Sequence, residues 1–118
     1  MKAAIDADAE SYNAVMKAYK EARTVSDQKA GDSLIDAALR QATTVPLSVA
    51  EKAHEIAQIV QTLEPITNPN MKSDLVTARA LAGAALVGAL ANVDINLTSM
   101  KDSTFAAEVR KKTAALQS

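Results

Sequence analysis

The sequence predicts an all-α protein, an up-and-down bundle of about five helices around one central helix rich in Ala and Gly. Apolar residues recur with the period of an amphipathic helix over most of the 118 residues. No stretch alternates between polar and apolar residues as a half-buried strand does. The segment 74–97 is apolar on most of its sides, which is typical of a helix in the middle of a bundle or an oligomer.

The first helix is expected over residues 2–22. Asp8 lies at the border of its apolar stripe, one turn before Tyr12 and in line with Val15. An acidic residue in a first turn often does no more than balance the helix dipole, so Asp8 indicates either a helix start or a functional carboxylate. The stripe itself consists of Ile5, Ala9, Tyr12, Met16 and Tyr19.

Two helical stretches are expected on either side of Pro46. Ser26 is expected to cap a helix over residues 27–44, which Pro46 ends or kinks because proline lacks an N–H. A third helix then runs to Leu63. His54, the one histidine of the chain, has no second ligand four residues away, and we interpret it as a partly exposed surface residue.

The longest expected loop covers residues 64–72 and carries two prolines and two asparagines. Ser73 is expected to cap the helix that follows, and Asp74 to place negative charge at the positive end of its dipole. After this helix, Asp102 is expected to cap a last helix.

The helix over residues 74–97 carries a stripe that is polar at both ends and nearly bare of side chain between them. Asn92 and Asn96 are expected to enter the interior as amides, which costs free energy unless they find partners. The pattern indicates either close helix packing or a ligand site, and periodicity alone favours packing. The stripe consists of Asp74, Ala78, Leu81, Ala85, Gly88, Asn92 and Asn96.

The composition restricts the classes of function. A net charge of −1 without a Lys/Arg block argues against a nucleic-acid partner, and the absence of Cys excludes disulfides and thiol chemistry. The uncharged stretch between Arg79 and Asp94 is shorter than the ~20 residues of a membrane span, so we expect no membrane association. The charged N-terminus indicates a cytoplasmic protein. A core with few aromatic residues favours a homodimer or higher homo-oligomer.

Four blocks in order along the chain carry a family resemblance. Residues 6–12 read Asp-Ala-Asp-Ala-Glu-Ser-Tyr, residues 42–47 read Ala-Thr-Thr-Val-Pro-Leu, and Asp102 is followed by Phe105. The longest block joins Asn68-Pro69-Asn70 and Ser73-Asp74-Leu75 to Asn92-Val93-Asp94-Ile95-Asn96-Leu97. Together they resemble the formiminotransferase-cyclodeaminase C-terminal domain family, which includes methenyltetrahydrofolate cyclohydrolases. That family's domain begins with a helical hairpin carrying a Pro-Gly-Gly-Gly-Ser turn, so residues 1–118 are expected to form a single domain that is N-terminally truncated relative to the family.

The resemblance implies an enzyme of folate one-carbon metabolism. Its small-molecule substrate is a tetrahydrofolate derivative, with no tightly bound cofactor and no metal. In a cyclodeaminase, N10 of the folate attacks the formimino carbon and ammonia leaves; in a cyclohydrolase, water opens the methenyl bridge. Asp8 and Asp74 are implied as the catalytic acid/base or orienting groups. The implied substrate-binding residues are Ser73, Asn92, Asn96, Pro46, Leu47 and Asn70.

A second interpretation belongs to a different class. The chain is then a truncated, catalytically inactive relative that keeps the helical scaffold and acts as an oligomeric binding or scaffold protein. The absent Gly-rich turn favours this interpretation, whereas the retained polar residues favour the enzyme.

Overall fold

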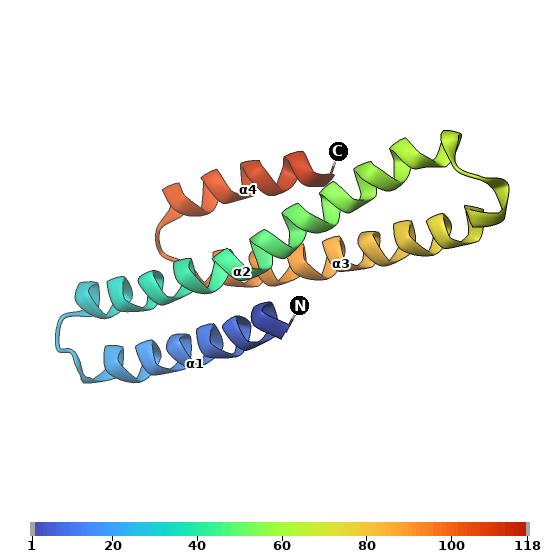
Figure 1. Cartoon of the computed structure of the whole chain (residues 1–118). Helices are drawn as coiled ribbons and strands as arrows, with labels where there is room; N and C mark the ends of the chain where they lie inside the picture. The colour runs from blue at the N-terminus through green and yellow to red at the C-terminus, as the bar shows by residue number, and fades with distance from the viewer. Residues whose placement is uncertain (1, 118) are drawn as a thin grey trace.

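The structure, a computed structural model, describes residues 2–117, with side chains from Asp6 onward. It is all-α over that range, without strands, which confirms the predicted fold class (Figure 1). Four α-helices are present instead of about five. They are α1 (Lys2–Thr24), α2 (Gln28–Leu63), α3 (Lys72–Ser99) and α4 (Ser103–Gln117). Two short 3-10 helices, η1 (Glu64–Ile66) and η2 (Pro69–Met71), connect α2 to α3.

The helix count differs from the prediction because α2 continues through Pro46. A proline inside a helix costs roughly 3 kcal/mol, because it removes one hydrogen bond and crowds the preceding turn. Here α2 packs against both α1 and α3, and residues on either side of the proline, including Ala42 and Ala50, are buried. This packing offsets the cost of the proline. The predicted cap at Ser26 is also wrong, since the Asp27 side chain accepts a hydrogen bond from the Lys29 N–H at 3.0 Å.

The start of α3 also differs from the prediction. The helix begins at Lys72, and Met71 occupies the capping position without a side-chain hydrogen bond. Ser73 therefore lies inside the first turn, and the prediction that it caps the helix is wrong. The cause is η2, in which the Asn68 side chain accepts from the Asn70 N–H at 3.0 Å and leads the chain directly into α3. Asp74 does lie in the first turn, as predicted.

The connection from α3 to α4 is fixed by two aspartates. Asp102 accepts a hydrogen bond from the Phe105 N–H at 3.1 Å, which confirms the predicted cap. Asp36 on α2 is buried and accepts from the backbone N–H groups of Lys101 at 2.9 Å and Asp102 at 2.7 Å. These bonds hold the end of α3 and the start of α4 against α2.

The densest core lies where α2, α3 and α4 meet. Val93, Leu97 and Val109 are its buried members, and Val93 is only 1% exposed. Leu47 and Phe105 pack around them, together with Met100 and Ala106. The densest core therefore lies near the middle of α2, beside the C-terminal part of α3.

The molecule is long and thin. Its Cα radius of gyration is 17.9 Å, against about 13.5 Å for a compact domain of this length. Its smallest extent is 14 Å, about the depth of two crossed helices. No helix among the described residues is therefore enclosed on every side, α3 included.

The exposure of α3 is relevant to the prediction that the protein does not associate with a membrane. By length and composition, Pro69–Ser99 is long and apolar enough to cross a bilayer, and 22% of its most apolar window is buried. One such helix is weak evidence, because a core helix of a soluble protein passes the same test. The absence of a membrane partner stays a prediction.

Candidate functional site

A cavity of about 320 Å³ lies between α1, α2 and α3, and we call it the α1–α3 pocket. The residues of α2 form its floor, and α1 and α3 form its walls. Four of the residues implied by the family resemblance line it, although they come from three separate helices. The full lining consists of Asp8, Ser11, Tyr12, Val15, Tyr19, Leu39, Ala42, Pro46, Asn92, Ile95, Asn96 and Ser99.

The wall formed by α1 is one stripe at helical spacing. Asp8, Tyr12, Val15 and Tyr19 are separated by three or four residues, so their side chains lie on one side of the helix. Asp8 is exposed at the open end of this stripe, while Tyr19 is half-buried. The predicted alignment of Asp8 with Val15 thus places the carboxylate at the pocket.

The floor contains Pro46 and Ala42, one turn apart on α2. In a regular helix the carbonyl of Ala42 accepts from the N–H four residues later, but proline has no N–H to donate. Pro46 therefore leaves the Ala42 carbonyl without its usual helical partner. Ala42 itself lines the pocket.

The wall formed by α3 presents two amides. Asn92 and Asn96 lie one turn apart and both line the pocket. The prediction that they enter the interior is wrong, because Asn92 is exposed and Asn96 is half-buried. The buried face of α3 consists instead of Ala82, Ala89, Val93 and Leu97, which turn about a quarter of a circle away from the amides.

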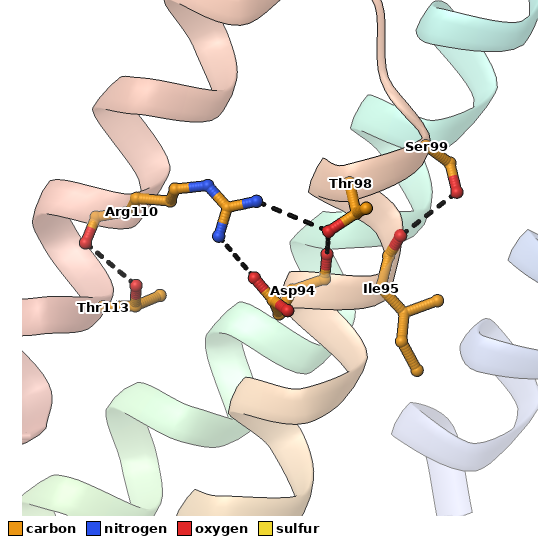
Figure 2. A network of polar contacts seen from close by, with 6 residues as sticks. All are labelled: Asp94, Ile95, Thr98, Ser99, Arg110 and Thr113. Atoms are coloured by element: carbon orange, nitrogen blue, oxygen red, sulfur yellow. Dashed lines mark hydrogen bonds and ion pairs between the residues drawn. The ribbon is translucent and has the colours of Figure 1, made fainter.

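Other polar groups at this end of α3 are already engaged on its far side. Asp94 pairs with Arg110 of α4, and the Thr98 hydroxyl donates to the Asp94 carbonyl at 2.8 Å (Figure 2). Figure 2 shows Ile95 and Ser99 on the opposite side of α3 from Arg110. The ion pair thus fixes α4 on one side of α3, while the pocket lies on the other.

The side chains of Asp8, Asn92 and Asn96 are free of protein partners. None of them makes a side-chain hydrogen bond or ion pair with another described residue. Asp36, Asp94 and Asp102, in contrast, are each bonded within the fold. The polar groups around the pocket are therefore available to a ligand. Within residues 2–117, no three His, Cys, Asp or Glu side chains gather closely enough to hold a metal ion.

The remaining implied site residues lie elsewhere. Ser73 and Asp74 are in the first turn of α3, and the helical rise places Asp74 ~27 Å along the axis from Asn92. Asn70 is in η2, beyond that end of the helix. Leu47 packs against the core of Val93, Leu97 and Val109 instead of lining the pocket. None of these four residues lines the α1–α3 pocket.

A second and larger hollow lies along the other half of α3, and we call it the α2–α3 groove. Its volume is about 950 Å³, and its lining is mostly apolar. Ala78, Leu81, Ala82 and Ala85 form one side, and residues of α2 from Thr44 to Ile56 form the other. The groove and the pocket both open along the same stripe of α3, because Ala78, Ala85, Asn92 and Asn96 follow one another at helical spacing.

Comparisons with known proteins identify the family of the chain. The sequence profile described as formiminotransferase-cyclodeaminase matches residues 1–115. The chain belongs to the formiminotransferase-cyclodeaminase family. The resemblance identified from the sequence blocks is thereby confirmed.

The relatives that the chain matches are larger proteins. It is 34% identical over 113 residues to the formimidoyltransferase-cyclodeaminase of Sus scrofa. The aligned segment covers 95% of this chain and 21% of the relative. It is 33% identical over 110 residues to the methenyltetrahydrofolate cyclohydrolase of Methylorubrum extorquens. This alignment covers 92% of the chain and 53% of the relative. The chain thus spans about a fifth of the first relative and about half of the second.

The family signature did not reveal every residue of the pocket. Ser11, Tyr19 and Ser99 line it, but the sequence interpretation assigned none of them to the site. Their signal was present, since Ser11 and Tyr19 follow Asp8 at helical spacing and Ser99 follows Asn96 by three residues. What was missing was the knowledge that α1 and α3 form the two walls of one cavity.

Proposed function

We propose that this family member binds a tetrahydrofolate derivative in the α1–α3 pocket and interconverts formimino- and methenyl-tetrahydrofolate as a cyclodeaminase or cyclohydrolase. One observation carries the proposal. Asp8, Asn92 and Asn96, drawn from two helices, line one cavity and have no side-chain partner among the described residues. Polar side chains at a concave, largely apolar site are what the binding of a heterocycle requires.

The chemistry of the pocket suits the proposed reaction. A carboxylate such as Asp8 accepts or donates a proton as N10 attacks the formimino carbon and the bond to the departing ammonia breaks. Each Asn amide supplies donors and an acceptor for the edge of a pterin, and the Ala42 carbonyl adds an acceptor. Tyr12 and Tyr19 offer aromatic faces against which the bicyclic ring packs.

The size of the pocket limits how much of the substrate it holds. A volume of about 320 Å³ is near the lower end of the roughly 300–1,000 Å³ of small-molecule sites. The bicyclic head fits such a volume, and the remainder of a folate extends past the open mouth. The α1–α3 pocket is therefore proposed as the site of the reacting end.

One observation favours the alternative of an inactive scaffold protein. Asp74, the second implied carboxylate, lies ~27 Å along α3 from Asn92. A single chain thus presents only half of the implied catalytic pair at the pocket. If two carboxylates are indispensable and no second chain supplies the other, the protein binds without turnover.

The test uses the ultraviolet absorbance of methenyltetrahydrofolate. Purified protein is expected to consume this chromophore with water, or to form it from the formimino compound with release of ammonia. Asp8→Asn is expected to lower kcat by about 100-fold or more, as is typical for loss of a general acid or base.

Asp6→Asn is the matched control, because Asp6 is exposed on α1 and does not line the pocket. Equal losses in the two variants would remove Asp8 from the site. Wild-type protein that neither consumes nor forms the chromophore would decide for the inactive scaffold.

A further inference from the structure

The α2–α3 groove continues the α1–α3 pocket along the same two helices. On α2, the pocket residues Ala42 and Pro46 are followed at a spacing of three or four residues by three residues of the groove. On α3, Ala85 of the groove lies two turns before Asn92 of the pocket and on the same side of the helix. A ligand that leaves the pocket past Pro46 and Asn92 therefore enters the groove. The groove residues in the series on α2 are Val49, Ala53 and Ile56.

Asp8 lies at the end of the pocket that faces the groove. Because α1 and α3 run in the same direction, Asp8 lies toward the Asn92 end of the pocket, and Tyr19 lies with Ser99 at the other end (Figure 1). In the proposed reaction the Asp8 carboxylate acts where N10 attacks the formimino carbon. N10 is also the atom of a folate that carries the aminobenzoyl-glutamate tail. A folate whose N10 lies near Asp8 therefore directs its tail toward the groove.

The groove combines apolar surface with a single positive charge. Ile56 and Leu81, from its two sides, are 49% and 66% exposed, so an aromatic ring that covers them removes apolar surface from water. Lys52 is the one charged residue of the groove lining, and its ammonium group has no hydrogen-bond or ion-pair partner among the described residues. A carboxylate is the complementary group for such an ammonium. The aminobenzoyl-glutamate tail carries both an aromatic ring and carboxylates.

We propose that the α2–α3 groove binds the aminobenzoyl-glutamate tail of the substrate, with the ring against its apolar lining and a carboxylate paired with Lys52. The inference rests on the proposed function, because that function places the head of the folate in the α1–α3 pocket. The helical rise places Lys52 ~9 Å beyond Pro46 along α2. An aromatic ring followed by one amino acid bridges such an interval.

The opposite end of the pocket offers the tail a second exit, and its charges suit the tail less well. A hollow of about 440 Å³ shares Tyr19 and Ser99 with the pocket and is also lined by Lys101 and Asp32. The carboxylate of Asp32 repels a second carboxylate in the same hollow. No acidic residue lines the α2–α3 groove, so the groove is the better site for the tail.

The two lysines provide a matched test of the exit. Lys52→Ala is expected to raise KM about two- to fivefold with kcat unchanged, because an exposed ion pair remote from the reacting atoms is made equally in substrate and transition state. Lys101→Ala is expected to leave both constants unchanged. With methenyltetrahydropteroate, which lacks the glutamate, Lys52→Ala is expected to match the wild type. A raised KM in Lys101→Ala alone, or the same loss on both substrates in Lys52→Ala, overturns the proposal.

Two neighbouring alanines of α3 test the groove itself. Ala84 and Ala85 are both exposed, but only Ala85 lines the groove. Ala85→Glu places a bulky negative side chain there and is expected to raise KM about tenfold, whereas Ala84→Glu stays near the wild type. Far-UV circular dichroism checks that both variants fold. If Ala85→Glu changes the mass found by light scattering but not KM, a protein partner occupies the groove and the proposal is overturned.

Binding measurements separate the tail site from the proposed reaction. Titration calorimetry with tetrahydrofolate and tetrahydropteroate requires no turnover, and the wild type is expected to bind tetrahydrofolate more tightly by the same two- to fivefold factor, which Lys52→Ala removes. This result in protein without turnover supports the tail site and contradicts the proposed reaction. An active wild type that binds both compounds equally keeps the reaction and overturns the tail site. If neither compound binds, both proposals fail.

Discussion

Asp8 and Asp36 show how two aspartates of one chain take different roles. Asp36 is buried and accepts two backbone N–H groups, whereas Asp8 is exposed at the α1–α3 pocket with no side-chain partner among the described residues. The family resemblance indicated Asp8 but gave no sign of Asp36. The reason is that the partners of Asp36 lie 65 and 66 residues away in the sequence. The sequence motif therefore identified the unbonded carboxylate of Asp8, whereas the bonded carboxylate of Asp36 belongs to no motif.

The bonds of Asp36 predict a loss of stability in Asp36→Ala. Two backbone N–H groups lose a charged acceptor, each such bond being worth about 1.5–3 kcal/mol, so the free energy of unfolding is expected to fall by about 3 kcal/mol. Urea denaturation followed by circular dichroism measures the change. Asp32→Ala, one turn earlier on α2 and without a side-chain bond to the described residues, is expected to change it by less than ~0.5 kcal/mol. Equal effects would contradict the role assigned to Asp36.

At the scale of elements, α2 departs most from what local sequence rules predict. Propensity alone ends a helix near Pro46, yet α2 continues from Gln28 to Leu63. The packing of α1 and α3 on its two sides decides the matter, and that packing is non-local. The start of α3 follows the same logic, since the turn at Asn68 and Pro69 replaces the expected cap by Ser73.

Pro46→Ala is predicted to separate stability from binding. Alanine at position 46 restores an N–H that donates a helical hydrogen bond to the Ala42 carbonyl. The free energy of unfolding is therefore expected to rise by up to about 3 kcal/mol. The same change removes a free acceptor from the α1–α3 pocket, so affinity for a tetrahydrofolate derivative is expected to fall about five- to tenfold. Thermal unfolding and titration calorimetry measure the two effects. Lower stability with unchanged affinity would contradict the account of Pro46.

At the scale of the whole molecule, the elongated shape is the dominant feature. The radius of gyration is 17.9 Å, and the other helices of the chain leave one face of α3 uncovered (Figure 1). Two layers of packed elements normally surround one core, and here the cluster of larger buried side chains lies near Val93 and Leu97, while the buried apolar residues elsewhere are mostly alanines. The thin core expected from the composition is therefore visible, while the homo-oligomer that it favours stays a proposal.

The homo-oligomer favoured by the composition predicts a stability that depends on protein concentration. Because dissociation accompanies unfolding, the wild-type Tm is expected to rise as protein concentration increases from micromolar to hundreds of micromolar. Scanning calorimetry at several concentrations measures this dependence. A wild-type Tm independent of concentration would argue against the homo-oligomer.

The sequence by itself determined the helical class, the family, the cap at Asp102 and the alignment of Asp8 with its stripe. Each of these depends on residues within a few turns of one another or on a local motif. Only the tertiary structure decided that Pro46 lies inside one long helix, that Asn92 and Asn96 border a pocket instead of the interior, and that Asp8 of α1 lines the same pocket. The physical reason is that periodicity fixes which residues share a face of a helix, whereas contacts between helices distant in sequence fix which face is covered.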